Sequence, residues 1–86
     1  MKITTETGSI YDIDDSGICR KYRDGKVVDS FKPLFMRSVP DTVKSLEEIY
    51  ELPESELKIG DRLYISGLNN WWISTRMVRI EYANTR

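Results

Sequence analysis

Short runs of alternating apolar and polar residues cover most of the chain, and turn-forming residues separate them. The alternation predicts four strands within the first 32 residues, at the stretches KITTET, SIYDID, ICRKYR and KVVDSFK. The Asp24-Gly25 pair between the last two is typical of a tight hairpin. Two longer strands are predicted at LKIGDRLYISG and WWISTRMVRIEYA, residues 57–67 and 71–83.

One segment has a helical period instead. Apolar residues recur at helical spacing over residues 42–51, and a proline stands just before and just after the segment. We expect Asp41 or Thr42 to cap a short α-helix near 42–51. Many short strands with one helix indicate a mainly β fold, a small antiparallel barrel that is SH3-like or similar. The whole chain, residues 1–86, is predicted to form one small β-barrel domain.

The last predicted strand does not alternate consistently. Ile73 and Val78 both suit a core, but they fall in opposite phases of a regular strand. A β-bulge near Ser74–Arg76 would place both inside, and we favour that register, with Trp71 inward and Trp72 outward. In either register one indole lies outside the core, which is typical of an interface or a ligand site.

Composition narrows the possible chemistry. The chain has no histidine and a single cysteine, Cys19, so it can form neither an internal disulfide nor an ordinary zinc site. No apolar run approaches the roughly 20 residues of a membrane span, and no secretory signal is visible. We expect a cytoplasmic protein without metal or cofactor.

The formal charge of −1 is distributed unevenly. It is −3 over residues 1–17, +4 over 18–40, −5 over 41–61 and +3 over 62–86, which sums to −1. The basic segments can converge on an anionic partner, or pair with the acidic segments and cancel. The low overall charge and the acidic helix argue against nucleic-acid binding.

Motifs for catalysis and metal binding are weak. The stretch DIDDSG matches the start of a calcium loop, but Arg23 stands where that loop requires a glutamate, so we expect an acidic turn. Cys19 has no imidazole partner, and Glu47 and Glu51 are expected on a solvated helix face. The chain also lacks a glycine-rich phosphate loop. We therefore expect no enzymatic activity and no catalytic residue.

Aromatic, amide, hydroxyl and guanidinium groups gather between Asn70 and Arg76, and this composition suits a binding site. An indole can stack on a flat base, and arginine can pair with phosphate. Each polar group also has a structural alternative, since Asn69-Asn70 suits a turn and Ser74-Thr75 suits a bulge. The predicted ligand-binding residues are Trp71, Trp72, Asn70, Ser74, Thr75, Arg76, Arg62 and Arg20.

Three blocks, TTETGSIYDID, GDRLYI and WWISTRMVRIE, resemble small β-barrel proteins encoded by phages and mobile elements. Among small phage proteins of this size are anti-defence sponges, oligomers that sequester nucleotide second messengers without cleaving them. The resemblance covers about a third of the chain. It implies a homo-oligomer that traps a nucleotide-like anionic small molecule, and it assigns no individual site residue.

The leading hypothesis is therefore a non-catalytic, oligomeric sponge of this kind, cytoplasmic in a bacterial host. A second hypothesis is a protein-interaction module that inhibits or adapts a host protein through the exposed tryptophan or the acidic segment 41–61. A third is a small barrel that binds nucleic acid through its basic strands.

Overall fold

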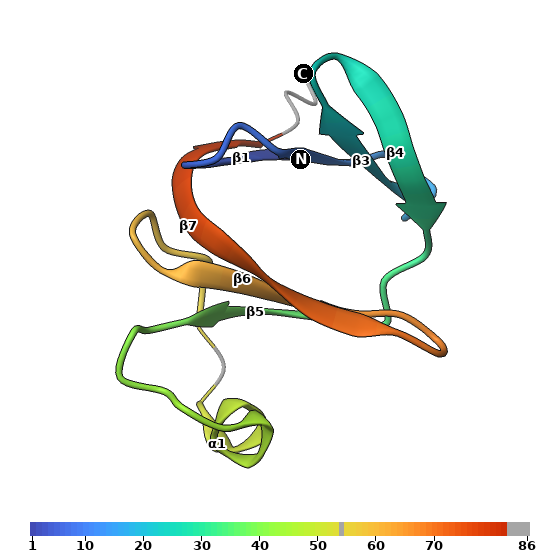
Figure 1. Ribbon diagram of the computed structural model, residues 1–86. Helices are drawn as coiled ribbons and strands as arrows, with labels where there is room; N and C mark the ends of the chain where they lie inside the picture. The colour runs from blue at the N-terminus through green and yellow to red at the C-terminus, as the bar shows by residue number, and fades with distance from the viewer. Residues whose placement is uncertain (54, 83–86) are drawn as a thin grey trace.

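A computed structural model describes residues 1–53 and 55–82, and in it the chain forms seven strands and one helix (Figure 1). This confirms the predicted mainly β class with one short helix. The elements are β1 (Lys2–Thr5), β2 (Ile10–Ile13), β3 (Cys19–Arg23), β4 (Lys26–Phe31), β5 (Phe35–Val39), α1 (Leu46–Glu51), β6 (Arg62–Ser66) and β7 (Trp71–Glu81).

The strands form one antiparallel sheet in the order β4-β3-β2-β1-β7-β6-β5. β7 is the longest strand, and it pairs with β6 through its first half and with β1 through its second. Figure 1 shows the sheet curled along β7, so that β1 and β3 lie across from β5 and β6. The ladder ends at β4 and β5, so the sheet is open along these two edges.

The inner side of the curled sheet holds the main core. Its fully or almost fully buried members come from five strands: Ile3, Tyr11, Cys19, Leu63, Ile65 and Met77. Leu63 and Ile65 are successive inward positions of β6, as expected for residues two apart in a strand. Because both halves of the sheet contribute, burial of apolar area is what holds the curl.

A second core lies on the opposite face, between the sheet and α1. Val39, Ile49 and Tyr64 are buried there, with Ile73 of β7 packed against them. Tyr64 lies between the inward residues Leu63 and Ile65, so β6 is covered on both faces. This second core explains why apolar residues in β6 and β7 do not keep to one phase.

The helix begins later than predicted. Its N-cap is Ser45, whose hydroxyl accepts from Glu48 N–H while the Glu48 carboxylate accepts from Ser45 N–H, a complete capping box. The prediction of Asp41 or Thr42 as the cap was therefore wrong. Val43 N–H donates to Pro40 O (3.1 Å), so the residues before Ser45 form a turn instead.

Two strand boundaries also differ from prediction. β5 was not predicted, because the prolines on either side of FMRSV obscure a five-residue edge strand. The strand predicted from residue 57 begins only at Arg62. Gly60 has a φ of +97° in the preceding turn, which ends any continuous extended segment there.

Two irregularities in β7 decide which side chains face inward. Between the pairs Arg62–Arg76 and Tyr64–Ile73, β7 has two residues, Ser74 and Thr75, opposite the single Leu63. This confirms the bulge predicted near Ser74–Arg76. A second register shift lies between β7 and β1, where Thr4 pairs with Arg79 and Thr5 with Met77, so that Val78 has no partner. Met77 is fully buried there, and Val78 is half exposed (51 %).

The predicted orientation of the two tryptophans was wrong. Trp72 packs against the inner core, with its ring edge-to-face with Phe31 at 4.6 Å, whereas Trp71 is 52 % exposed on the other face. The prediction assumed that Ile73 and Val78 share one core. Ile73 instead belongs to the core under α1, and Val78 lies outside at the second bulge.

The capping box predicts where the helix is sensitive to mutation. Ser45→Ala should lower the free energy of unfolding by about 1 kcal/mol, because it removes the acceptor for Glu48 N–H. Thr42→Ala, at the position that the sequence pattern favoured, should change it by less than about 0.5 kcal/mol. Urea unfolding of both variants measures these free energies. A larger loss of stability for Thr42→Ala than for Ser45→Ala would show that Ser45 is not the cap.

Candidate functional site

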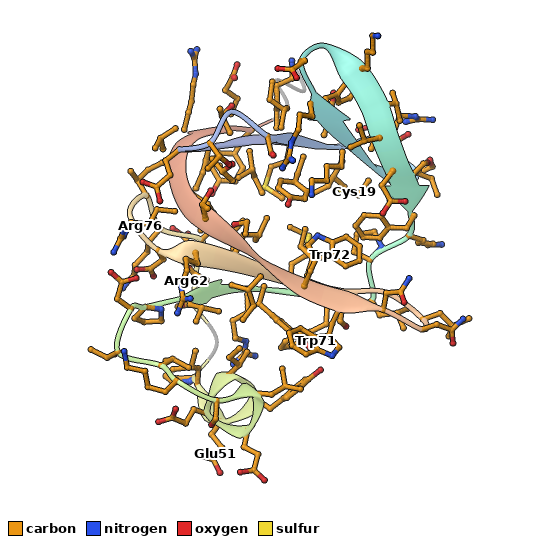
Figure 2. All side chains as sticks on the ribbon, in the orientation of Figure 1. Cys19, Glu51, Arg62, Trp71, Trp72 and Arg76 are labelled. Atoms are coloured by element: carbon orange, nitrogen blue, oxygen red, sulfur yellow. The ribbon has the colours of Figure 1, made fainter. Side chains whose placement is uncertain are left out.

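A groove runs along the outer face of the sheet, between β7 and the residues that lead into α1. It consists of two open depressions, of about 560 and 280 Å³, that share Lys44, Arg62 and Ile73 as lining residues. One end is aromatic and the other is charged. Figure 2 shows Trp71 beside α1, with Arg62 and Arg76 toward the other end of the same strands.

Trp71 forms the aromatic end. It stands on the same face of β7 as Ile73, and Tyr64 lies beside it, with ring centroids 5.9 Å apart and planes 38° from parallel. Tyr64 is itself held by the Tyr50 hydroxyl at 2.7 Å, and burial together with this hydrogen bond raises the pKa of Tyr64 to about 12. The phenol under the indole thus stays neutral, and the exposed half of Trp71 is free to stack on a ligand.

Two arginines and two carboxylates form the charged end. Arg76 is directly opposite Arg62 in the β6–β7 ladder, and like charges in that position repel. Asp41 lies against both: it accepts a hydrogen bond from Arg76 Nη2, and its Oδ1 is 3.8 Å from Arg62 Nε. Glu6 adds a contact at 3.8 Å to Arg76 Nη1.

These contacts determine the charge of the groove at neutral pH. Hydrogen bonding and attraction to Arg76 lower the pKa of Asp41, and the same pair raises the pKa of Arg76, so both are ionised. Lys44, Arg62 and Arg76 contribute +3 against −2 from Glu6 and Asp41. The groove lining therefore carries a net charge of +1, and both of its carboxylates lie against the guanidinium groups.

The two hydroxyls predicted to bind ligand are engaged in the fold. Ser74 Oγ accepts from Leu63 N–H at 3.0 Å and donates to Thr75 O at 2.6 Å, which closes the bulge. Thr75 Oγ1 lies 3.1 Å from Thr7 Oγ1. Both residues line the groove, but their first role is to hold β7 in its irregular register.

Five of the eight predicted site residues come together in this groove, and three lie elsewhere. Trp72 is in the inner core, and Figure 2 shows it directed toward Cys19, away from Trp71. The Asn70 carbonyl accepts from Gly67 N–H (2.7 Å) in the β6–β7 turn. Arg20, on β3, is paired with Asp14 at 2.8 Å. The groove residues are Arg62, Trp71, Ser74, Thr75 and Arg76.

The acidic stretch DIDDSG forms a turn, as expected. Asp14 Oδ1 accepts from Ser16 N–H, Ser16 Oγ and Ile18 N–H, which leaves the carboxylate fully engaged. These hydrogen bonds and Arg20 hold the pKa of Asp14 well below its usual range. Within residues 1–53 and 55–82, no three metal-binding side chains cluster.

Cys19 is a core residue. Its side chain is fully buried, and burial raises its pKa from 9.0 to about 11. A thiol with that pKa is neutral at physiological pH and is a poor nucleophile. Its neighbours in the inner core are apolar, so Cys19 acts there as a small apolar side chain.

No protein-family model, curated protein or solved structure matched this chain in the comparisons. Among the described residues, no helix is long and apolar enough to cross a membrane. The site therefore has to be interpreted from its own geometry.

Three charged residues of the groove, Glu6, Asp41 and Lys44, are not among the predicted ligand-binding residues. The sequence pattern predicts Asp41 only as a possible helix cap. Glu6 lies 70 residues before Arg76, and its backbone N–H donates to Arg76 O at 2.8 Å across the β1–β7 contact. Only the pairing of β1 with β7 could have shown this, so no local signal was available.

The placement of the two indoles predicts unequal costs of truncation. Trp72→Ala should lower the free energy of unfolding by about 3 kcal/mol, because it opens the inner core beside Phe31. Trp71→Ala should cost clearly less, since half of that side chain is already exposed. Chemical denaturation compares them, and a larger loss for Trp71→Ala would contradict the placement.

The buried thiol predicts an alkaline loss of stability. The pKa of Cys19 is higher in the folded than in the unfolded chain, so ionisation above about pH 9 favours unfolding, and stability should fall between about pH 9 and pH 11. The Cys19→Ala variant should be less stable at neutral pH, but its free energy of unfolding should fall less over the same pH range. Urea midpoints at each pH provide the measurement, and parallel curves for the two proteins would disprove this assignment.

Proposed function

We propose that the protein is a non-catalytic binding protein whose ligand is a nucleotide-like anion held in the groove between Trp71 and Arg76. The observation that carries the proposal is the geometry of that groove: a half-exposed indole at one end and two arginines at the other. Its volume lies in the range of small-molecule sites. A base stacked on Trp71 would direct its phosphate toward Arg62 and Arg76.

The chemistry of the described residues agrees with binding rather than catalysis. Cys19 is buried and neutral, and the carboxylates of the groove are held by arginines. Arginines that neutralise a phosphate and an aromatic ring that stacks on a base supply affinity and orientation. They supply no proton acceptor near neutral pH.

In its sharpest form, the protein is a phage-type anti-defence sponge: a cytoplasmic homo-oligomer that sequesters a nucleotide second messenger. The resemblance of its sequence blocks to such proteins motivates this form. The curled seven-stranded sheet, taken as a small SH3-like barrel, gives a rigid support for the groove. Phe35, Tyr50 and Trp71 form a partly exposed aromatic surface that a second subunit would cover.

A second candidate function is a protein-interaction module. The same aromatic surface lies beside α1, whose Glu47, Glu48 and Glu51 have no basic residue in the last turn to balance them. Exposed aromatic rings beside carboxylates suit a basic segment of a partner protein. Recovery of one stoichiometric partner in a pull-down, lost in Tyr50→Ala, would favour this function over nucleotide binding.

Ligand binding is tested by a thermal-shift panel of linear and cyclic nucleotides. At least one should raise Tm in a concentration-dependent manner, because a ligand that binds only the folded state stabilises it. Trp71→Ala and Arg62→Gln should each abolish the shift. Arg20→Gln, a predicted site residue that lies outside the groove, is the matched control and should keep it. No shift with any nucleotide at millimolar concentration would refute the proposal.

A further inference from the structure

Two arginines face each other across the β6–β7 ladder at the charged end of the groove. The pair Arg62–Arg76 follows directly from the bulge, which makes these residues cross-strand neighbours. Two guanidinium groups in that position repel, and they need a counter-ion between them. The pair therefore defines an anion site before any ligand is considered.

Asp41 fills that site from within the chain. One of its oxygens accepts from Arg76 Nη2, and the other lies 3.8 Å from the buried Arg62 Nε, which is beyond hydrogen-bond distance. A single carboxylate thus satisfies Arg76 well and Arg62 poorly. A tetrahedral oxyanion with two negative charges offers more acceptor oxygens than a carboxylate and would satisfy the second guanidinium group as well.

Asp41 lies in the segment between β5 and α1, outside any strand or helix. It follows Pro40 and precedes the helix, in a turn closed by one hydrogen bond from Val43 N–H to Pro40 O. A further long contact, from Arg62 Nη2 to Val43 O at 3.4 Å, joins this turn to β6. The turn is attached to the sheet by the buried side chain of Val43, which packs in the core under α1, and by the contacts of Asp41 with the two arginines.

We propose that Asp41 is an internal counter-ion that occupies the ligand's anion position, and that a phosphate group binds by displacing it. This rests on the proposed function only in placing the ligand's phosphate at Arg62 and Arg76. Displacement frees the Asp41 side chain from the arginines while Val43 stays packed in the core under α1, so occupancy of the groove alters the turn at 41–45 beside the start of α1. It also makes the site selective, because an anion has to bind the arginines better than a carboxylate does.

The selectivity follows from charge. A carboxylate such as acetate replaces Asp41 without gain, so it should not compete with the tethered group. Inorganic phosphate, largely a dianion above pH 7, pairs with both arginines and should bind. The class of ligand assigned to the site is therefore one that carries a terminal, doubly charged phosphate group.

The test compares inorganic phosphate binding in the wild-type chain and in Asp41→Asn, by NMR titration at constant ionic strength. Asp41→Asn keeps the shape and removes the competing charge, so its affinity for phosphate should rise about two- to fivefold, the range that an exposed ion pair supports. Asp14→Asn, which breaks the similarly exposed pair with Arg20, should leave the affinity at the wild-type value. Adding Arg62→Gln to Asp41→Asn should abolish the gain.

In the wild-type titration, phosphate should shift the amide signals of Val43 and Lys44, and acetate should not. Equal phosphate affinity in the wild type and Asp41→Asn, or shifts confined to residues outside 41–45, would overturn the inference. The result separates it from the proposed function. Phosphate that binds more tightly to Asp41→Asn while every nucleotide fails to bind would keep the internal counter-ion and remove the nucleotide.

Discussion

The hydrogen bond from Leu63 N–H to the Ser74 hydroxyl is the interaction on which most of the structure depends. It satisfies a backbone donor at the point where β7 inserts an extra residue, and it allows the ladder to continue on both sides of the insertion. Without the insertion, the two halves of β7 would keep one phase. Ile73 and Met77 would then point to the same face, so Met77 could not lie in the inner core while Ile73 packs in the core under α1.

The same irregularity creates the candidate site. It brings Arg76 opposite Arg62, and it leaves Trp71 and Ile73 on the outer face beside the turn that leads into α1. A regular strand would distribute these groups over both faces. Packing and binding chemistry therefore have a common origin here: the bulge that stabilises two small cores also gathers an indole and two guanidinium groups along one groove.

Much of the fold could be predicted from local pattern. Alternation and turn residues located β1 to β4, and the phase conflict between Ile73 and Val78 indicated a bulge at the correct place. The orientation of the indoles could not be predicted, because it depends on whether one or both faces of β7 are covered. That depends on α1 packing over Tyr64, a tertiary contact that no window of the sequence contains.

The site could be predicted only in part, because it too depends on tertiary contacts. Residues close together in β7 were found, since a strand keeps its neighbours together, and Arg62 was predicted as an arginine able to pair with phosphate. Asp41 and Glu6 were missed because they reach Arg76 from 35 and 70 residues away. Arg20 and Asn70 resembled site residues by type alone, but their hydrogen bonds belong to local turns.

The central claim is that the bulge in β7 directs Trp72 into the core and leaves Trp71 at the groove. Hydrogen exchange of the two indole N–H groups, followed by NMR, tests it most directly. The Trp72 Nε1 proton, which is buried, should exchange only with unfolding, while the Trp71 proton should exchange within the dead time. Slow exchange at Trp71 with fast exchange at Trp72 would contradict it.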